Sequence, residues 1–450
     1  MTEIASQQEL IDIAAQVLDR ARVHGADAAD AVIVEGSSTS ASCRMGKLED
    51  IERSEARDLG IRVFVGQSSA SVSSTDFSPA QLDLATERAV AMARAAPPDK
   101  FAGLAGADNL ASDIPDLDLY DDHAADPADL RALAEEAEAA ALEVAGVTNS
   151  LGASASTGTG GIVLATSEGF VGAYRSSSFS ISCSVVAGEG TAMERDYDYS
   201  SALHFDALRE PAEIGRSAAE KAVRRLKPRK PATRSLPVVY DPRVSASLLG
   251  HLAGAISGSA ITRGTSFLKD KLGTAVFATG ISVIDDAHRR RGLRSKPFDG
   301  EGVANERLAL VEDGVLQCWL LDSRTARQLG LATNGRASRG VGSPPSPSPT
   351  NLYLAPGTVP PAALMADIAE GLYVTDLIGM GVNGVTGDYS RGAAGFWIEN
   401  GELAYPVSEC TIAGNLGTMF AALTAADDLE FRYGTNAPTV RIEGMTVAGS

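Results

Sequence analysis

Apolar residues recur with helical spacing at three places in the first 145 residues. The first stripe predicts a helix that opens with a capping box of Ser6 and Glu9 and ends at Gly25; its members are Leu10, Ile13, Ala14, Val17, Leu18 and Ala21. Two further helices are predicted from Ser78 to about Arg94 and from Asp126 to about Ala145. Short alternating runs at 31–35, 60–65 and 70–75 predict strands, and residues 97–125, rich in Pro, Asp and Gly, predict a loop.

From Thr148 to about Val186 the pattern changes to alternating strands rich in Ser, Thr and Gly, and a helix is predicted over about 211–226. The segment KPRKPATRSLP, residues 227–237, has three prolines among four basic residues and is typical of a domain boundary. Beyond it, Asp313-Gly314 and Asn400-Gly401 each separate two alternating apolar runs, which predicts two β-hairpins.

These elements predict an α+β chain of two domains, and 450 residues suffice for both. Residues 1–226, divided into 1–125 and 126–226, form an N-terminal α/β domain with helices on a mostly antiparallel sheet. Residues 227–237 form a linker. Residues 238–450 form a β-rich C-terminal domain with pseudobarrel or sandwich-like sheets.

Composition narrows the possible partners. A formal net charge of −19 repels phosphate backbones, so no nucleic-acid partner is expected. The polar first residues do not resemble a signal peptide, and no apolar run approaches the roughly eighteen residues of a membrane span. Four cysteines lie far apart with no C-x-x-C pair, which is typical of a reducing compartment. We therefore expect a cytoplasmic protein without a membrane partner.

Motifs that carry chemistry are few. Gly379–Gly384 matches G-x-G-x-x-G by letter, but turns and a hairpin follow it where a nucleotide site needs a helix, so a tight structural loop is predicted. Thr157–Gly161 lacks the lysine and the helix of a P-loop. There is no G-x-S-x-G elbow, and none of the five histidines stands in a recognisable catalytic sequence. The sequence therefore predicts no catalytic residue.

His251 differs from the other histidines because it lies in a predicted helix that starts near Pro242. Its neighbours at helical spacing include Leu248, Leu252 and Ala255. A lone histidine on an apolar face is typical of a core or an interface. A metal site would need partner ligands, and no histidine or glutamate lies within five residues.

Several stretches, taken in order, resemble the TldD/PmbA family. GIRVF, ASVSSTDFS and LATERAVAMAR are similar to its first domain. LLGHLAGAISGSAITRGTSFLKDKLG, FDGEGVANERLALVEDGVLQCWLLDSRTARQLG and GMGVNGVTGDYSRGAAGFWIENGELAYPVSECTIAGN resemble its PmbA branch, also called TldE. The resemblance extends from about residue 11 to residue 447.

The TldD branch of this family carries H-E-x-x-x-H on the corresponding helix. Its histidines bind zinc with a later cysteine, and its glutamate acts as general base. In this chain the first ligand matches His251, the glutamate position is Leu252, and the second histidine position is Ile256. No cysteine follows Asp428, where the third ligand is expected. The resemblance therefore implies no metal ligand set and no bound cofactor in this chain.

The resemblance implies a non-catalytic subunit that pairs with a TldD-type zinc subunit around a chamber that receives unfolded peptides. We expect a homodimer when the chain is isolated. Two alternatives stay open: a substrate-binding homodimer with no peptidase partner, and a peptidase acting alone with an unrecognised metal site. For the second, Asp285, Asp286 and His288 are the candidate ligands.

Residues 334–351 are a candidate border of that chamber. The stretch GRASRGVG is glycine-rich and doubly basic, and GVGSPPSPSPTN predicts an extended, polyproline-like surface loop. A mobile loop beside a stiff one would suit a lid. The candidate substrate-chamber residues are Arg336, Arg339, Ser343, Pro345 and Asn351.

Overall fold

A long, curved, antiparallel sheet forms the first half of the computed structural model, which describes residues 7–449. The strand order is β3-β2-β1-β4-β5-β6. Its strands are β1 Ala28–Arg44, β2 Lys47–Val65, β3 Ser68–Ser74, β4 Val147–Thr166, β5 Val171–Ala187 and β6 Glu194–Ala202. The helices of this half are α1 Gln7–Val23, α2 Pro79–Ala95, α3 Pro127–Leu142 and α4 Pro211–Arg224, with short 3-10 turns η1 Ala107–Asn109, η2 Gly190–Ala192 and η3 Phe205–Ala207.

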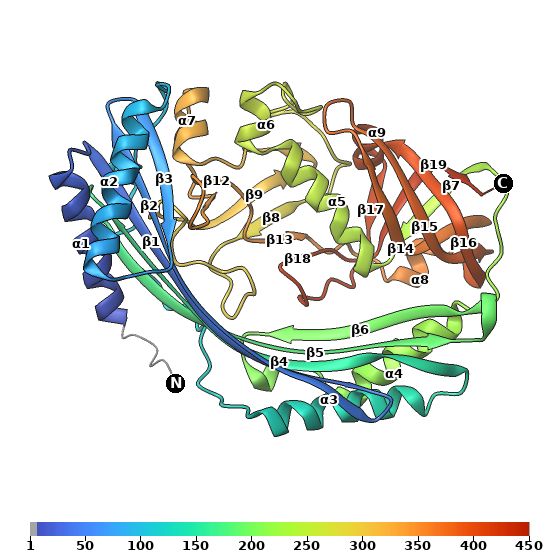
Figure 1. Cartoon of the computed structure of the whole chain (residues 1–450). Helices are drawn as coiled ribbons and strands as arrows, with labels where there is room; N and C mark the ends of the chain where they lie inside the picture. The colour runs from blue at the N-terminus through green and yellow to red at the C-terminus, as the bar shows by residue number, and fades with distance from the viewer. Residues whose placement is uncertain (1–6, 450) are drawn as a thin grey trace.

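The helices cover one face of this sheet in two separate pairs. Side chains alternate between the faces of a strand, so residues two apart lie on the same side. Ala31 and Ile33 of β1 are buried against α1 and α2, whereas Ala41 and Cys43 are buried against α3 and α4. Figure 1 shows the two helix pairs on the convex side of the sheet and the second half of the chain on its concave side.

The strands β1 and β2 are much longer than the sequence pattern predicts. They pair continuously from Ala28 and Phe64 to Arg44 and Lys47 with one bulge. Most of β2 from Lys47 to Ala56 is exposed. Backbone hydrogen bonds to β1 continue the ladder through this polar stretch. Because β3 pairs only with Leu59–Val65, the other side of the stretch is an open edge, and its charged side chains protect it from unwanted pairing.

The second half contains a closed barrel and a smaller sheet. The barrel order is β16-β15-β14-β7-β19, and pairing between β16 and β19 closes it, with β17 added at the edge. The second sheet has the order β10-β9-β8-β13-β18. The bounds are β7 Arg234–Tyr240, α5 Pro242–Ala255, α6 Gly258–Thr262, β8 Val283–Asp286, β9 Arg307–Glu312, β10 Val315–Leu316, α7 Ser323–Leu329, β11 Ala337–Ser338, β12 Ser346–Pro347, β13 Asn351–Leu354, α8 Pro361–Met365, β14 Glu370–Val382, β15 Asp388–Glu399, β16 Glu402–Asn415, α9 Leu416–Ala421, β17 Leu423–Ala425, β18 Thr435–Asn436 and β19 Val440–Ala448.

The predicted α+β class with a β-rich, barrel-like C-terminal half is confirmed by these sheets. The hairpin turns at Asp313-Gly314 and Asn400-Gly401 lie where they are predicted, with Asp313 and Asn400 at positive φ. Ser6, predicted to cap the first helix, lies outside the described residues. Within residues 7–449, no helix combines the length and the apolar character needed to cross a bilayer.

The segment predicted as a linker is shorter than 227–237. The strand β7 begins at Arg234, and its first residues pair with β19. The backbone N–H of Arg229 also donates to the Pro406 carbonyl at 2.9 Å, and the Arg229 carbonyl accepts from Ser408. The irregular connection between the two halves is therefore held against β16 rather than free in solvent.

The two halves meet through close backbone packing and buried charge. A Cβ built on Gly60 of β2 would lie 2.3 Å from the backbone oxygen of Val341. Beside it, the Arg62 Nε donates to Asp30 Oδ2 at 2.9 Å, and Arg339 of the C-terminal half forms an ion pair with the same carboxylate. The side chains of Asp30, Arg62 and Arg339 are all almost fully buried. The halves therefore pack as one unit in this region.

We expect Gly60→Ala to lower the free energy of unfolding by about 1–3 kcal/mol, because the added methyl group overpacks the contact with Val341. A matched control is Gly250→Ala in α5, where an added Cβ meets no atom within 4 Å. That helical substitution should raise the stability by roughly 0.5–1 kcal/mol. Urea unfolding of both variants measures the two effects, and equal stabilities would contradict the tight contact at Gly60.

Candidate functional site

The helix α5 carries His251 and Leu252, which the resemblance aligns with the TldD zinc motif, and its start follows from the local sequence. Pro242 occupies the first turn, and the Asp241 carboxylate caps the helix by accepting the Arg243 N–H at 2.9 Å. Leu248, Leu249 and Leu252 lie on the face that packs into the barrel core. The helix thus presents one face to the core and the opposite face to solvent.

The resemblance to the TldD branch places Leu252 and Ile256 at the positions of its general base and second zinc ligand. Both side chains are fully buried, at 0% exposure, in the apolar core of the C-terminal half. Their methyl groups can neither bind zinc nor accept a proton from water. Among residues 7–449, no group of three or more His, Cys, Asp or Glu side chains is placed to hold a metal ion. The donor set around His251 does not fit a catalytic zinc.

His251 points to the opposite side, into a groove between α5 and β14. The groove has a volume of about 330 Å³ and is lined by Gly250, His251, Gly254, Ala255, Thr265, Phe267, Met380, Val382, Gly384 and Leu416. We call it the α5–β14 groove. The Nε2 atom of His251 is buried and makes no hydrogen bond within the described part of the chain. Burial, together with the charge of Arg391, lowers the pKa of His251, so the imidazole is neutral near pH 7.

His251 lies in a helix, as the sequence predicts, but the sequence analysis did not predict the groove. The missed residues are the two glycines one helical turn apart, Gly250 and Gly254, and the strand residues Met380 and Val382. The G-H-L-A-G spacing is visible in the sequence. The contribution of β14 was not, because it lies more than a hundred residues away and depends on the barrel topology.

The alternative metal ligands Asp285, Asp286 and His288 are engaged in structural contacts. The Asp285 carboxylate is fully buried, forms an ion pair with Arg336, and accepts the Thr350 N–H at 2.6 Å. One Asp286 oxygen accepts the His288 N–H at 3.1 Å, and the His288 ring nitrogen lies 2.7 Å from the Asn305 side chain. These contacts account for the three side chains without a metal ion.

The prediction that Arg336 and Arg339 belong to a mobile, substrate-facing loop is wrong. The Arg336 side chain is 0% exposed beside Asp285, and the Arg339 side chain is 2% exposed beside Asp30. The stretch is held because β11 pairs with β12 in a small hairpin that packs between the two halves. The two arginines of this glycine-rich stretch therefore form buried ion pairs.

The other members of the predicted chamber loop have different surroundings. Pro345 and Asn351 are buried, and the Asn351 amide donates to the Asp286 carbonyl at 2.7 Å. Ser343, at the tip of the hairpin, is exposed. A contact between Ser343 and a substrate stays a prediction, whereas Pro345 and Asn351 are positioned for packing.

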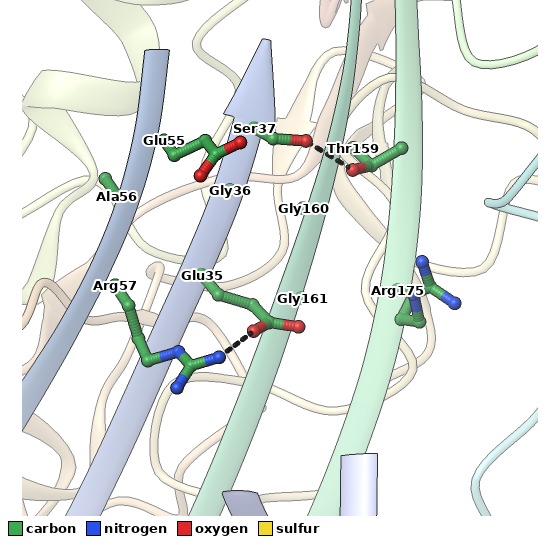
Figure 2. A pocket seen from close by; sticks show the side chains of 10 residues that line it. All are labelled: Glu35, Gly36, Ser37, Glu55, Ala56, Arg57, Thr159, Gly160, Gly161 and Arg175. Atoms are coloured by element: carbon green, nitrogen blue, oxygen red, sulfur yellow. Dashed lines mark hydrogen bonds and ion pairs between the residues drawn. The ribbon is translucent and has the colours of Figure 1, made fainter. Parts of the chain in front are cut away.

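A second pocket, of about 210 Å³, lies on the convex face of the large sheet (Figure 2). It occupies the gap between the two helix pairs, since Glu35 and Ser37 continue the face of β1 that carries Ile33 and Ala41. Figure 2 shows Glu35 pointing toward Arg57, at 3.6 Å, and Ser37 toward Thr159, at 3.1 Å. These polar groups satisfy each other, and neither hydroxyl has a histidine among the residues lining the pocket.

The nucleotide-like motif Gly379–Gly384 lies at the end of β14 and in the turn before β15, with Gly379 at positive φ. No helix begins at its third glycine, since β15 follows at Asp388. The geometry lacks the helix N-terminus on which phosphate binding depends.

Comparison with known proteins places these features in a family. Sequence models of the PmbA/TldA metallopeptidase family match the chain with domain 1 at residues 29–93, the central domain at 120–226 and the C-terminal domain at 233–449. The chain is 40% identical to a metalloprotease PmbA homolog from Haemophilus influenzae, over 99% of this chain and 97% of the relative. It is 37% identical to metalloprotease PmbA from Escherichia coli O157:H7, over 100% and 98%.

Solved structures agree in fold. A candidate modulator of DNA gyrase from Bacteroides thetaiotaomicron superposes with a TM-score of 0.91 at 27% identity, over the full length of both chains. TldE from Thermococcus kodakarensis gives a TM-score of 0.85 at 19% identity, over 99% of this chain and 100% of the other, and shares the fold. The matches along the whole chain show that this protein belongs to the PmbA/TldA metallopeptidase family and has relatives in its PmbA branch.

Proposed function

We propose that this chain is the non-catalytic, PmbA/TldE-type subunit of a two-component cytoplasmic metallopeptidase that degrades or processes unfolded peptides. One observation carries the proposal: Leu252 and Ile256, at the base and ligand positions, are fully buried parts of the apolar core. A side chain that holds a core together is not poised to enter a metal site. The chain can then serve proteolysis only beside a subunit that supplies the zinc.

The proposed partner is a TldD-type zinc subunit, and a homodimer takes its place when the chain is isolated. The strong negative charge of the chain argues against a nucleic-acid partner. The relatives named metalloprotease support a role in proteolysis at the level of the family.

Two alternative functions have less support from the structure. A peptidase acting alone would need a metal site, and the candidate cluster at Asp285 is occupied by the ion pair with Arg336. A peptide-binding homodimer with no peptidase partner is compatible with the same core packing. Partner-dependent cleavage separates that function from the proposed one.

We expect the purified chain to bind no stoichiometric zinc and to leave unfolded casein intact. Casein cleavage should appear when a TldD-type subunit is added, above the rate of that subunit alone, because that subunit would supply the metal and the base. Metal analysis and a casein assay on the separate chains and on the mixture measure this. Stoichiometric zinc in this chain, lost in His251→Ala, would contradict the proposal, as would a mixture no more active than the partner alone.

A further inference from the structure

The α5–β14 groove has the properties of a binding site, and its floor is the first of them. Gly250 and Gly254 lie one turn apart on the exposed face of α5, and a Cβ on either would meet no atom within 4 Å. Glycine in a helix costs roughly 1 kcal/mol relative to alanine. Nothing in the packing of the helix requires these two glycines. The space above them accounts for their presence, because any side chain there would reduce the groove.

A buried polar atom without a partner faces this space. The Nε2 of His251 is buried and makes no hydrogen bond within residues 7–449. The ring is fixed edge-on against Tyr389, with 5.9 Å between the ring centres. An unsatisfied buried polar atom costs about 1–3 kcal/mol. A neutral imidazole nitrogen can donate to a carbonyl or accept from an amide, so a peptide bond would satisfy it.

The rim of the groove is apolar. Met380, at the groove, is 86% exposed, and its neighbours in the sequence Ile378 and Val385 are 63% and 54% exposed. Met380 also lines the groove, together with Phe267 and Leu416. Exposed apolar side chains that gather around a hollow mark a binding surface, and methionine adapts to ligands of different shape. The chemistry of the rim therefore favours an apolar group over a charged one.

The wall formed by β14 favours an extended ligand. This strand pairs with β7 only between Leu372 and Val374, whereas its pairing with β15 continues to Val382. Beyond Val374, the edge of β14 that pairs with β7 has no ladder partner in the described part of the chain. Met380 and Val382 of this stretch line the groove, so an open strand edge lies beside it.

We propose that the α5–β14 groove binds an apolar side chain of an unfolded peptide, with His251 Nε2 hydrogen-bonded to the peptide main chain. The inference takes its ligand class, unfolded peptide, from the proposed function. It assigns to the degenerate zinc position a binding role in place of the lost catalytic one. The two glycines make room for the side chain, and the orphaned nitrogen holds the backbone beside it.

The first test fills the groove. Gly254→Leu places a leucine where the peptide side chain would lie, and the open space around Gly254 lets the variant fold. Ala139→Leu is the matched control, because it adds an exposed leucine to α3. The probe is a fluorescein-labelled unstructured peptide with one central leucine, titrated with the purified chain and followed by anisotropy. We expect Gly254→Leu to weaken binding roughly tenfold or more, as the loss of one buried leucine side chain implies, and Ala139→Leu to leave it unchanged.

The second test addresses the nitrogen. His251→Phe keeps a ring against Tyr389 but removes Nε2, so binding should weaken by roughly fivefold to tenfold. His251→Gln keeps a hydrogen-bonding group and should restore part of the affinity. Replacing the central leucine of the peptide with serine should weaken binding to the wild-type chain, and this loss should disappear in Gly254→Leu. Thermal melting of each variant confirms that it is folded.

These results separate the inference from the proposed function. If the wild-type chain fails to bind the peptide, or if Gly254→Leu and His251→Phe bind it as the wild type does, the inference is wrong even when the mixture with a TldD-type subunit cleaves casein. If the variants weaken binding as expected but no partner supports cleavage, peptide binding in the groove is supported and the proposed function is wrong.

Discussion

Replacing Arg336 with methionine is expected to lower the free energy of unfolding by about 3–5 kcal/mol, the usual cost of stranding one member of a buried ion pair. Both side chains of the pair with Asp285 are 0% exposed. The guanidinium also donates to the carbonyls of Asn334 and Gly335 at 3.1 Å. Without it, the donors left to the Asp285 carboxylate within residues 7–449 would be the Thr350 N–H and hydroxyl.

A double variant makes this expectation sharper. In Arg336→Met with Asp285→Asn, no buried charge is left unpaired, and the asparagine oxygen can still accept the Thr350 N–H. It should therefore be more stable than Arg336→Met alone. Arg432→Ala is the surface control, since the Arg432 pair with Glu430 is half exposed and should contribute no more than about 1 kcal/mol. Urea unfolding of all three variants is the measurement, and an Arg336→Met variant as stable as Arg432→Ala would refute a stabilising role for the buried pair.

Elements with a local cause were predictable from the sequence. The helices that begin at Pro79, Pro127, Pro211 and Pro242 are confirmed close to their predicted starts. All four have proline in the first turn, and Asp126 and Asp241 also cap their helices. Both effects act within three or four residues, so the local sequence contains their cause. The same holds for the hairpin turns, where Gly314 and Gly401 take the positive φ that the turn requires.

Elements with a distant cause were not predictable to the same degree. The polar stretch of β2 from Lys47 to Ala56 lacks the apolar alternation of a strand, and it pairs because β1 provides a continuous ladder beside it. Likewise, the exposure of Arg336 was misjudged because its partner Asp285 stands 51 residues earlier. Composition predicts the exposure of loop side chains correctly only when no charged residue distant in the sequence forms an ion pair with them.

Asp299 is a second buried group, and its ionisation depends on its surroundings. Its Oδ1 accepts the N–H groups of Glu301 and Val303, and its Oδ2 accepts the N–H of Ala337 at 3.0 Å. Burial, followed by the repulsion from Glu301, raises the pKa of Asp299 from 3.8 to about 7. Glu301 lies beside Arg62 of the large sheet, at 4.0 Å, so this pair sits where the two halves of the chain meet.

The raised pKa sets the direction of a pH effect on stability. Between about pH 4 and pH 7 the folded chain holds a proton on Asp299 that the unfolded chain has released, so the free energy of unfolding falls as the pH rises through this window. The full loss is at most on the order of 4 kcal/mol, since each unit of pKa corresponds to about 1.4 kcal/mol. Asp299→Asn cannot ionise, so the stability of the wild type relative to this variant should fall from about pH 4 to about pH 7. Urea unfolding of both proteins across that range measures the difference, and a difference that stays constant would mean that the Asp299 carboxyl titrates near its ordinary pKa.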